Sequence, residues 1–152
     1  VGGKGNEGVA QYVQKIDGSI GYVEYAYALN NGIPHVKLAN RAGQLVEPTQ
    51  ETFQAAAANA DWQNAPGFYM VLTDQPGEKS WPITGASFIL LHAEQQDEAT
   101  AEAMLDFFAW CFAGGDEAAA KLHYVPIPDA VVTLVENQWR SGITVDGKPF
   151  WK

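Results

Sequence analysis

The first residues of the chain carry a glycine spacing that occurs in nucleotide-binding enzymes. The run Gly3-Lys4-Gly5-Asn6-Glu7-Gly8 has the pattern G-x-G-x-x-G, and Glu24 follows at about the distance of a ribose-binding acid. A dinucleotide site also requires a buried strand before the first glycine, because the turn delivers the pyrophosphate to a helix N-terminus. Only Val1 precedes Gly2 here. The pattern favours a plain glycine turn, and a dinucleotide-binding oxidoreductase is the alternative to it.

Other catalytic patterns give no support to an enzyme. His35, His92 and His123 stand apart, without the H-x-x-x-H or C-x-x-C spacing that gathers ligands around a metal. The chain has no G-x-S-x-G elbow, which would present a nucleophilic serine. We expect no catalytic residue, no metal site and no cofactor.

Charge and length restrict the class of protein. The 152 residues fit one domain, and they carry a net charge of −9 with an isoelectric point near 4.6. Nucleic-acid binding is excluded, because the nine lysines and arginines are scattered rather than clustered. An acidic chain also repels anions at long range, so an anionic ligand would need short-range donors in a shielded pocket.

Apolar periodicity and capping residues predict several helices and a few short strands. The expected helices cover residues 6–15 (with Asn6 as the N-cap), 24–31, 49–59 (with Thr49 as the N-cap), 98–113, 116–123 and 129–140. The expected strands cover residues 20–23, 34–38 paired with 45–46, and 83–92, with a hairpin-like tail at 145–148. Residues 61–80 are expected to be irregular. This mixture indicates an α/β or α+β fold, and each side of residues 61–80 forms only a partial layer.

Several separate stretches resemble one family of proteins. They are GGKGNEGVAQYVQ, GSIGYVEYAYA, ADWQNA, SWPITGASFILLH, LDFFAWCFAGG, YVPIPDAVVTLVENQW and DGKPF. In this order they resemble the later half of the periplasmic phosphate-binding protein of bacterial phosphate importers. The resemblance spans nearly the whole chain, so it is far more specific than the glycine pattern.

The resemblance implies an α/β, two-lobed clamshell fold of the periplasmic-binding-protein type, with this chain supplying part of each lobe. Residues 1–79 would complete one lobe, which is the second domain of the family fold. Residues 80–152 would cross back to the first lobe, with hinge candidates Trp81, Pro82, Ile83 and Thr84. The family performs no covalent chemistry: it binds inorganic phosphate in the cleft and delivers it to an ABC permease in the inner membrane.

The sequence departs from the family at the ligand itself. The family's phosphate ligands lie in its earlier half, in motifs that this chain lacks, so no ligand residue is carried over. The residues of the glycine turn remain weak candidates for the side of the cleft: Gly3, Lys4, Gly5 and Asn6. Arg41 and Arg140 do not match the family's anion-binding arginine segment.

We therefore expect a fragment or one half of an exported, periplasmic phosphate-binding protein, with the N-terminal half as its partner chain and the signal peptide not present in this chain. By itself it should bind phosphate weakly or not at all. A truncated, self-associating interaction module without ligand is a further alternative.

Overall fold

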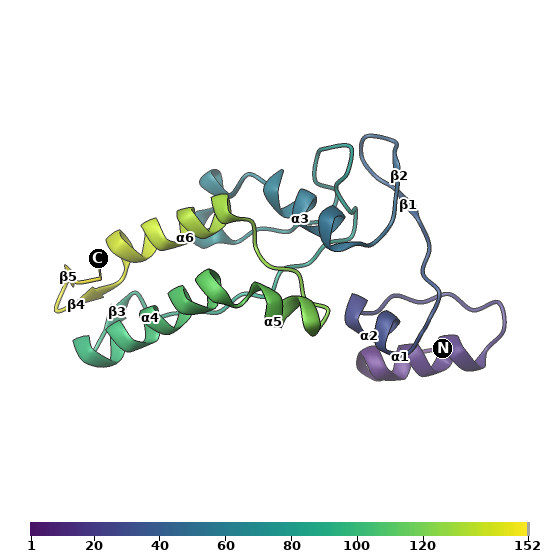
Figure 1. Cartoon of the computed structure of the whole chain (residues 1–152), viewed down its shortest axis with the longest axis horizontal. Coiled ribbons are helices and arrows are strands. Elements are labelled where there is room, and N and C mark those ends of the chain that lie inside the picture. Colours follow the sequence, from purple (N-terminus) through teal and green to yellow (C-terminus); the bar gives the residue numbers. More distant parts are fainter. Residues whose placement is uncertain (152) are drawn as a thin grey trace.

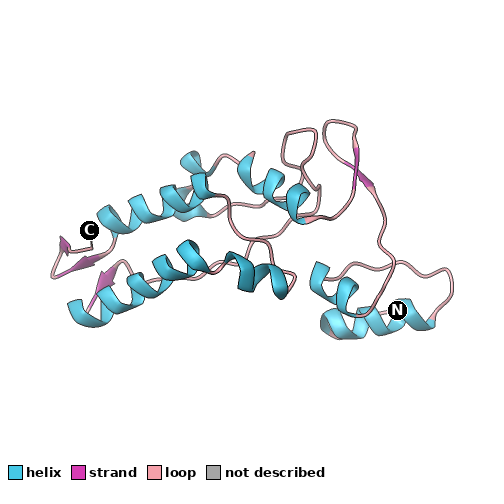
Figure 2. Cartoon of the chain, viewed as in Figure 1, coloured by secondary structure: helices cyan, strands magenta, loops and turns pink. Residues whose placement is uncertain are grey.

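The computed structural model describes residues 1–151 as a chain of helices with very little strand (Figure 2). The helices in this part of the chain are α1 (Gly5–Lys15), α2 (Tyr25–Asn30), α3 (Gln50–Ala58), α4 (Glu98–Gly114), α5 (Asp116–Lys121) and α6 (Asp129–Gly142), with 3₁₀ turns η1 (Trp62–Asn64) and η2 (Pro66–Phe68). The strands are β1 (Leu38–Ala39), β2 (Leu45–Val46), β3 (Glu94–Gln95), β4 (Thr144–Val145) and β5 (Lys148–Pro149).

The elements form an elongated arrangement (Figure 1). Helices α1 and α2 pack together at one end, and an extended stretch leads from them to the β1–β2 hairpin and α3. Helices α4 and α6 run side by side toward the other end, where β3, β4 and β5 lie near the C-terminus. None of the described helices is long and apolar enough to cross a membrane.

The helices agree with the sequence to within a few residues, because their signals are local. Thr49 is the N-cap of α3, as expected, and the side chain of Asp97 caps α4 by accepting a bond from the Thr100 N–H. Two details were wrong. The N-cap of α1 is Lys4 rather than Asn6, and α5 ends at Lys121, two residues early.

The strands agree less well. The β1–β2 hairpin is antiparallel as expected, although it is shorter, and β4 and β5 form the expected tail hairpin. The strands expected at residues 20–23 and 83–92 are wrong: neither segment has regular secondary structure, and apart from one isolated bridge between Thr73 and Ile83 they belong to no ladder. An extended segment becomes a strand only when a neighbouring chain accepts and donates its backbone hydrogen bonds.

Two small hydrophobic clusters lie in the part of the chain from α3 to the C-terminal hairpin. The first contains Ala57, Ala60, Trp62, Leu72 and Val131, and joins α3, η1 and the start of α6. The second contains Leu105, Trp139 and Ile143, and joins α4 to the end of α6. Helix α6 therefore contributes to both clusters and fixes their relative position.

Candidate functional site

The glycine turn before α1 is closely packed rather than open. A Cβ atom on Gly3 would lie 2.5 Å from the nitrogen of Val9 and 2.6 Å from the carbonyl carbon of Gly8. Gly5, the first residue of α1, has a positive φ of 65°, which glycine adopts without steric cost. The glycines thus let the chain fold back onto the start of its own helix. Residues 1–4 form no strand, so the geometry gives no support to a dinucleotide site.

Asn6 connects the starts of the first two helices. Its side-chain oxygen accepts a hydrogen bond of 3.0 Å from the backbone N–H of Glu24, which is the N-cap residue of α2. Lys4, the N-cap residue of α1, makes no capping hydrogen bond with its side chain, which is exposed. The acceptor of Asn6 is therefore used inside the α1–α2 unit, and the placement of these residues beside a ligand cleft stays a prediction.

The segment of residues 80–84, which contains the four predicted hinge residues, is anchored on both sides. Ser80 is fully buried, and Trp81 and Thr84 are nearly so. The backbone N–H of Trp81 donates to the carbonyl of Thr52 in α3 over 3.0 Å, and the carbonyl of Pro82 accepts a bond of 2.9 Å from Asp74. Ile83, in contrast, is half exposed. The segment is thus tied to α3 and to the preceding loop, and its role as a hinge stays a prediction.

Asn40 fixes the start of this segment, although sequence reasoning did not single it out. Its amide nitrogen donates to the carbonyls of Gly77, Glu78 and Ser80 at 2.8–3.2 Å. Its side-chain oxygen accepts from the backbone N–H groups of Ala42 and Gln44. An asparagine at the start of a hairpin loop, here residues 40–44, is a known turn signal, but its long-range bonds are visible only in the fold.

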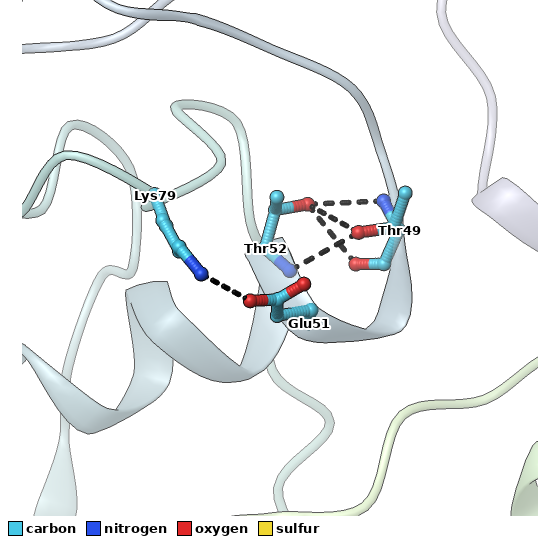
Figure 3. Close-up of polar contacts among 4 residues, drawn as sticks. All are labelled: Thr49, Glu51, Thr52 and Lys79. Carbon is cyan, nitrogen blue, oxygen red and sulfur yellow. Dashed lines mark hydrogen bonds and ion pairs between the residues drawn. The ribbon is translucent and has the colours of Figure 1, made fainter.

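The start of α3 lies beside Lys79, the residue that precedes Ser80 (Figure 3). Thr49 and Thr52 form a reciprocal capping box, in which each side chain accepts a bond from the other residue's backbone N–H. Next to them, Lys79 Nζ lies 2.5 Å from Glu51 Oε1. This hydrogen-bonded ion pair lowers the pKa of Glu51 and raises the pKa of Lys79. It links α3 directly to the residue that precedes Ser80.

A groove of about 510 Å³ opens between α3, Lys79 and the start of α6. Three carboxylates line it, those of Glu51, Asp116 and Asp129, and its one ammonium group, on Lys79, is already paired with Glu51. The net charge of the lining is negative. The groove therefore disfavours an anion, because no cation in it is free to offset the repulsion.

A second groove, of about 310 Å³, lies between the 3₁₀ turns and α6. Trp62, Phe68 and Leu134 contribute apolar walls, and amide side chains such as Gln138 contribute the polar ones. Neither arginine lines either groove. Arg140 instead pairs with Glu136 on α6 and stacks 5.1 Å above the ring of Trp151.

The histidines and carboxylates do not form a cation site in the described part of the chain, since no group of three potential metal ligands converges there. His35 packs edge-on against Tyr25 at 6.2 Å between ring centroids. Neither of the two grooves among residues 1–151 offers a free cationic side chain to a phosphate.

Comparison with known proteins identifies the class of this chain. No family profile matches it. A phosphate-binding protein PstS of Xylella fastidiosa is 55% identical over 141 residues, which cover 93% of this chain and 39% of that protein. The PstS of Pasteurella multocida is 51% identical over 152 residues (99% and 44%) and that of Haemophilus influenzae is 51% identical over 140 residues (92% and 42%).

These similarities place the mixed helices and short strands in the periplasmic-binding-protein class of folds. The chain belongs to the phosphate-binding protein (PstS) family. It spans about two fifths of the length of the curated relatives it matches.

Proposed function

We propose that this chain is part of a periplasmic phosphate-binding protein that captures inorganic phosphate and delivers it to an ABC permease in the inner membrane. The observation that carries the proposal is the identity of 51–55% to phosphate-binding proteins over more than nine tenths of the chain. Identity at this level along the whole chain is much more specific than the glycine pattern, which also occurs in unrelated turns. The function is binding and delivery, without a covalent step.

The ligands of phosphate come from the part of the protein outside residues 1–152. The grooves support this assignment, because one is lined by three carboxylates and the other lacks charged side chains. A dianion held at high affinity needs backbone N–H groups, hydroxyls or an arginine that point at one place. The remaining part of the protein is therefore a necessary partner for binding.

The chain contributes to both lobes of the clamshell, with residues 1–79 in one lobe, residues 80–152 in the other, and Trp81, Pro82, Ile83 and Thr84 at the crossing. The anchoring of Ser80 and Trp81 to Asn40 and Thr52 supports a well-defined crossing point. The first hydrophobic cluster contains Leu72 and Val131, which lie on opposite sides of this boundary. The two parts therefore contact each other near the crossing.

Isothermal titration calorimetry tests the function. The full-length polypeptide containing these residues should bind phosphate with micromolar or tighter affinity. Residues 1–152 alone should bind phosphate weakly or not at all. Tight binding by residues 1–152 would show that the ligands lie within them, and absence of phosphate binding by the full-length protein would refute the function.

A further inference from the structure

Helix α6 has one apolar face that packs against two different parts of the chain. Val131, Leu134, Val135 and Trp139 share this face, because they occupy positions i, i+3, i+4 and i+8 of the helix. Val131 and Leu134 belong to the first hydrophobic cluster, whereas Val135 and Trp139 belong to the second. The apolar face of one helix is thus divided between two cores.

The first cluster crosses the boundary between residues 1–79 and residues 80–152. Its buried members from residues 1–79 are Ala57, Ala60, Trp62 and Leu72. Residues 80–152 contribute Val131, which is 4% exposed, with Leu134 and Ile127 packed beside it. The start of α6 therefore lies in the core formed by residues 1–79.

The second cluster lies entirely within residues 80–152. Its buried members are Leu105 on α4, Trp139 on α6 and Ile143 at the end of α6. The ring of Trp139 stacks on that of Phe112, which also lies on α4, with 5.8 Å between the ring centroids. Figure 1 shows α6 and α4 side by side. The second half of α6 is therefore fixed to α4.

One hydrogen bond supports the apolar contact at the start of α6. Gln54 Nε2, on α3, donates to the carbonyl of Pro126 over 3.3 Å. In the described part of the chain, no other hydrogen bond or ion pair joins residues 1–79 to the chain beyond Thr84. The contact therefore depends mainly on the packing of Val131. Close-packed side chains interlock in a few discrete arrangements and do not slide freely, so this packing can fix an angle.

We propose that α6 is a brace between the two lobes: residues 1–79 hold its start, α4 holds its second half, and the packing of Val131 sets the angle between the lobes in the phosphate-free protein. The inference rests on the proposed function, because the lobes are those of the phosphate-binding clamshell. Apparent affinity depends on the fraction of molecules in the binding-competent arrangement. Val131 is thus a positioning residue, which acts on phosphate only through the angle between the lobes.

Double electron–electron resonance on the full-length protein in phosphate-free buffer tests the brace. Spin labels at Ala42→Cys and Glu102→Cys, both exposed, report the distance between the β1–β2 hairpin and α4 once all other cysteines, including Cys111, are replaced by serine. Val131→Ala should widen the distance distribution by more than about 2 Å, the scale of a lobe rearrangement.

The matched control is Val135→Ala, which makes the same change one helical turn later, within the second cluster. It should leave the width of the distribution unchanged, because both of its neighbouring elements belong to the same lobe. Equal widths in Val131→Ala and Val135→Ala would overturn the proposal, since Val131 would then have only the packing role that Val135 has.

Gln54→Ala decides the question if Val131→Ala does not fold. It removes the bond to Pro126 and leaves the first cluster intact, so it should widen the distribution, whereas Gln63→Ala, at an exposed position on η1, should not. Equal widths in these two variants would then overturn the proposal. Phosphate titration of the unsubstituted protein separates the two claims: a wider distribution in Val131→Ala without phosphate binding would refute the function and leave the brace standing.

Discussion

The side-chain amide of Asn40 donates a hydrogen bond of 3.2 Å to the main-chain carbonyl of Ser80, forty residues later in the sequence. This bond joins the β1–β2 hairpin to the start of the segment of residues 80–84. Both residues are buried, with Asn40 7% exposed and Ser80 fully inaccessible. A single buried side chain therefore connects two segments that lie forty residues apart in the sequence.

Asn40→Leu should destabilise the full-length protein by at least about 2 kcal/mol, because it leaves buried carbonyl and N–H groups without partners. Urea unfolding followed by circular dichroism measures the loss. Asn30→Leu is the matched control, since Asn30 is exposed at the end of α2, and it should change stability by less than about 0.5 kcal/mol. Equal losses in both variants would mean that the Asn40 bonds contribute nothing.

Gly21→Ala should lower the free energy of unfolding by about 1–2 kcal/mol. The added methyl group would crowd the side chains of Val9 and Val13. A Cβ atom at residue 21 would lie 2.9 Å from Val13 Cγ2 and 2.9 Å from Val9 Cγ1, both on α1. Adding Val9→Ala to Gly21→Ala should recover part of the loss, so the double-mutant cycle should show favourable coupling. Strict additivity in chemical denaturation would contradict the close approach of Gly21 to Val9 and Val13 on α1.

Thr49→Ala should destabilise the protein by about 1 kcal/mol, since it removes the acceptor for the N–H of Thr52 at the start of α3. Thr49→Ser keeps the hydroxyl and should retain most of the stability. Thermal unfolding of both variants measures the difference. A serine variant as unstable as the alanine variant would show that the methyl group, rather than the capping bond, matters.

Glu94 should contribute to stability in a pH-dependent way. Hydrogen bonds from the hydroxyl of Thr144 and the N–H of Gly147 lower the pKa of its carboxyl below the ordinary value of 4.5. Because the folded-state pKa is the lower one, this contribution is complete above pH 4.5 and is lost as the pH falls through the folded pKa. Glu94→Gln should therefore lower the melting temperature at pH 7 more than at pH 3.

The control for this pH dependence is Glu102→Gln, which removes an exposed carboxylate on α4. Its effect should be small at both pH values. A pH-independent effect of Glu94→Gln would show that the bonds to Thr144 and Gly147 do not favour the ionised form.

The success of the helix predictions and the failure of the strand predictions have one physical origin. Helix α3 could be placed from Thr49 and the alanines that follow, because its hydrogen bonds close within four residues. Residues 83–92 have the apolar pattern of a strand, but a strand also needs neighbours, and the described chain supplies only a bridge at Ile83. An apolar pattern alone therefore does not make these residues a strand.

In the candidate site, too, residue types could be read from the sequence, whereas the contacts between them could not. The sequence shows that the family's anion-binding motifs are missing, and the structure adds that one groove is lined by the carboxylates of Glu51, Asp116 and Asp129. Asn6 was expected to cap α1, yet its side chain bonds to Glu24, because the packing of α2 on α1 offers it a better-placed donor.

The sequence by itself determined the family, the positions of the helices, and the likeness of the chain to only part of a longer protein, since these depend on residue identity and local hydrogen bonding. Only the tertiary structure decided the role of Asn40, the close packing of Gly21, and the division of the apolar face of α6 between two clusters. These depend on contacts between residues far apart in the sequence, which no local pattern specifies.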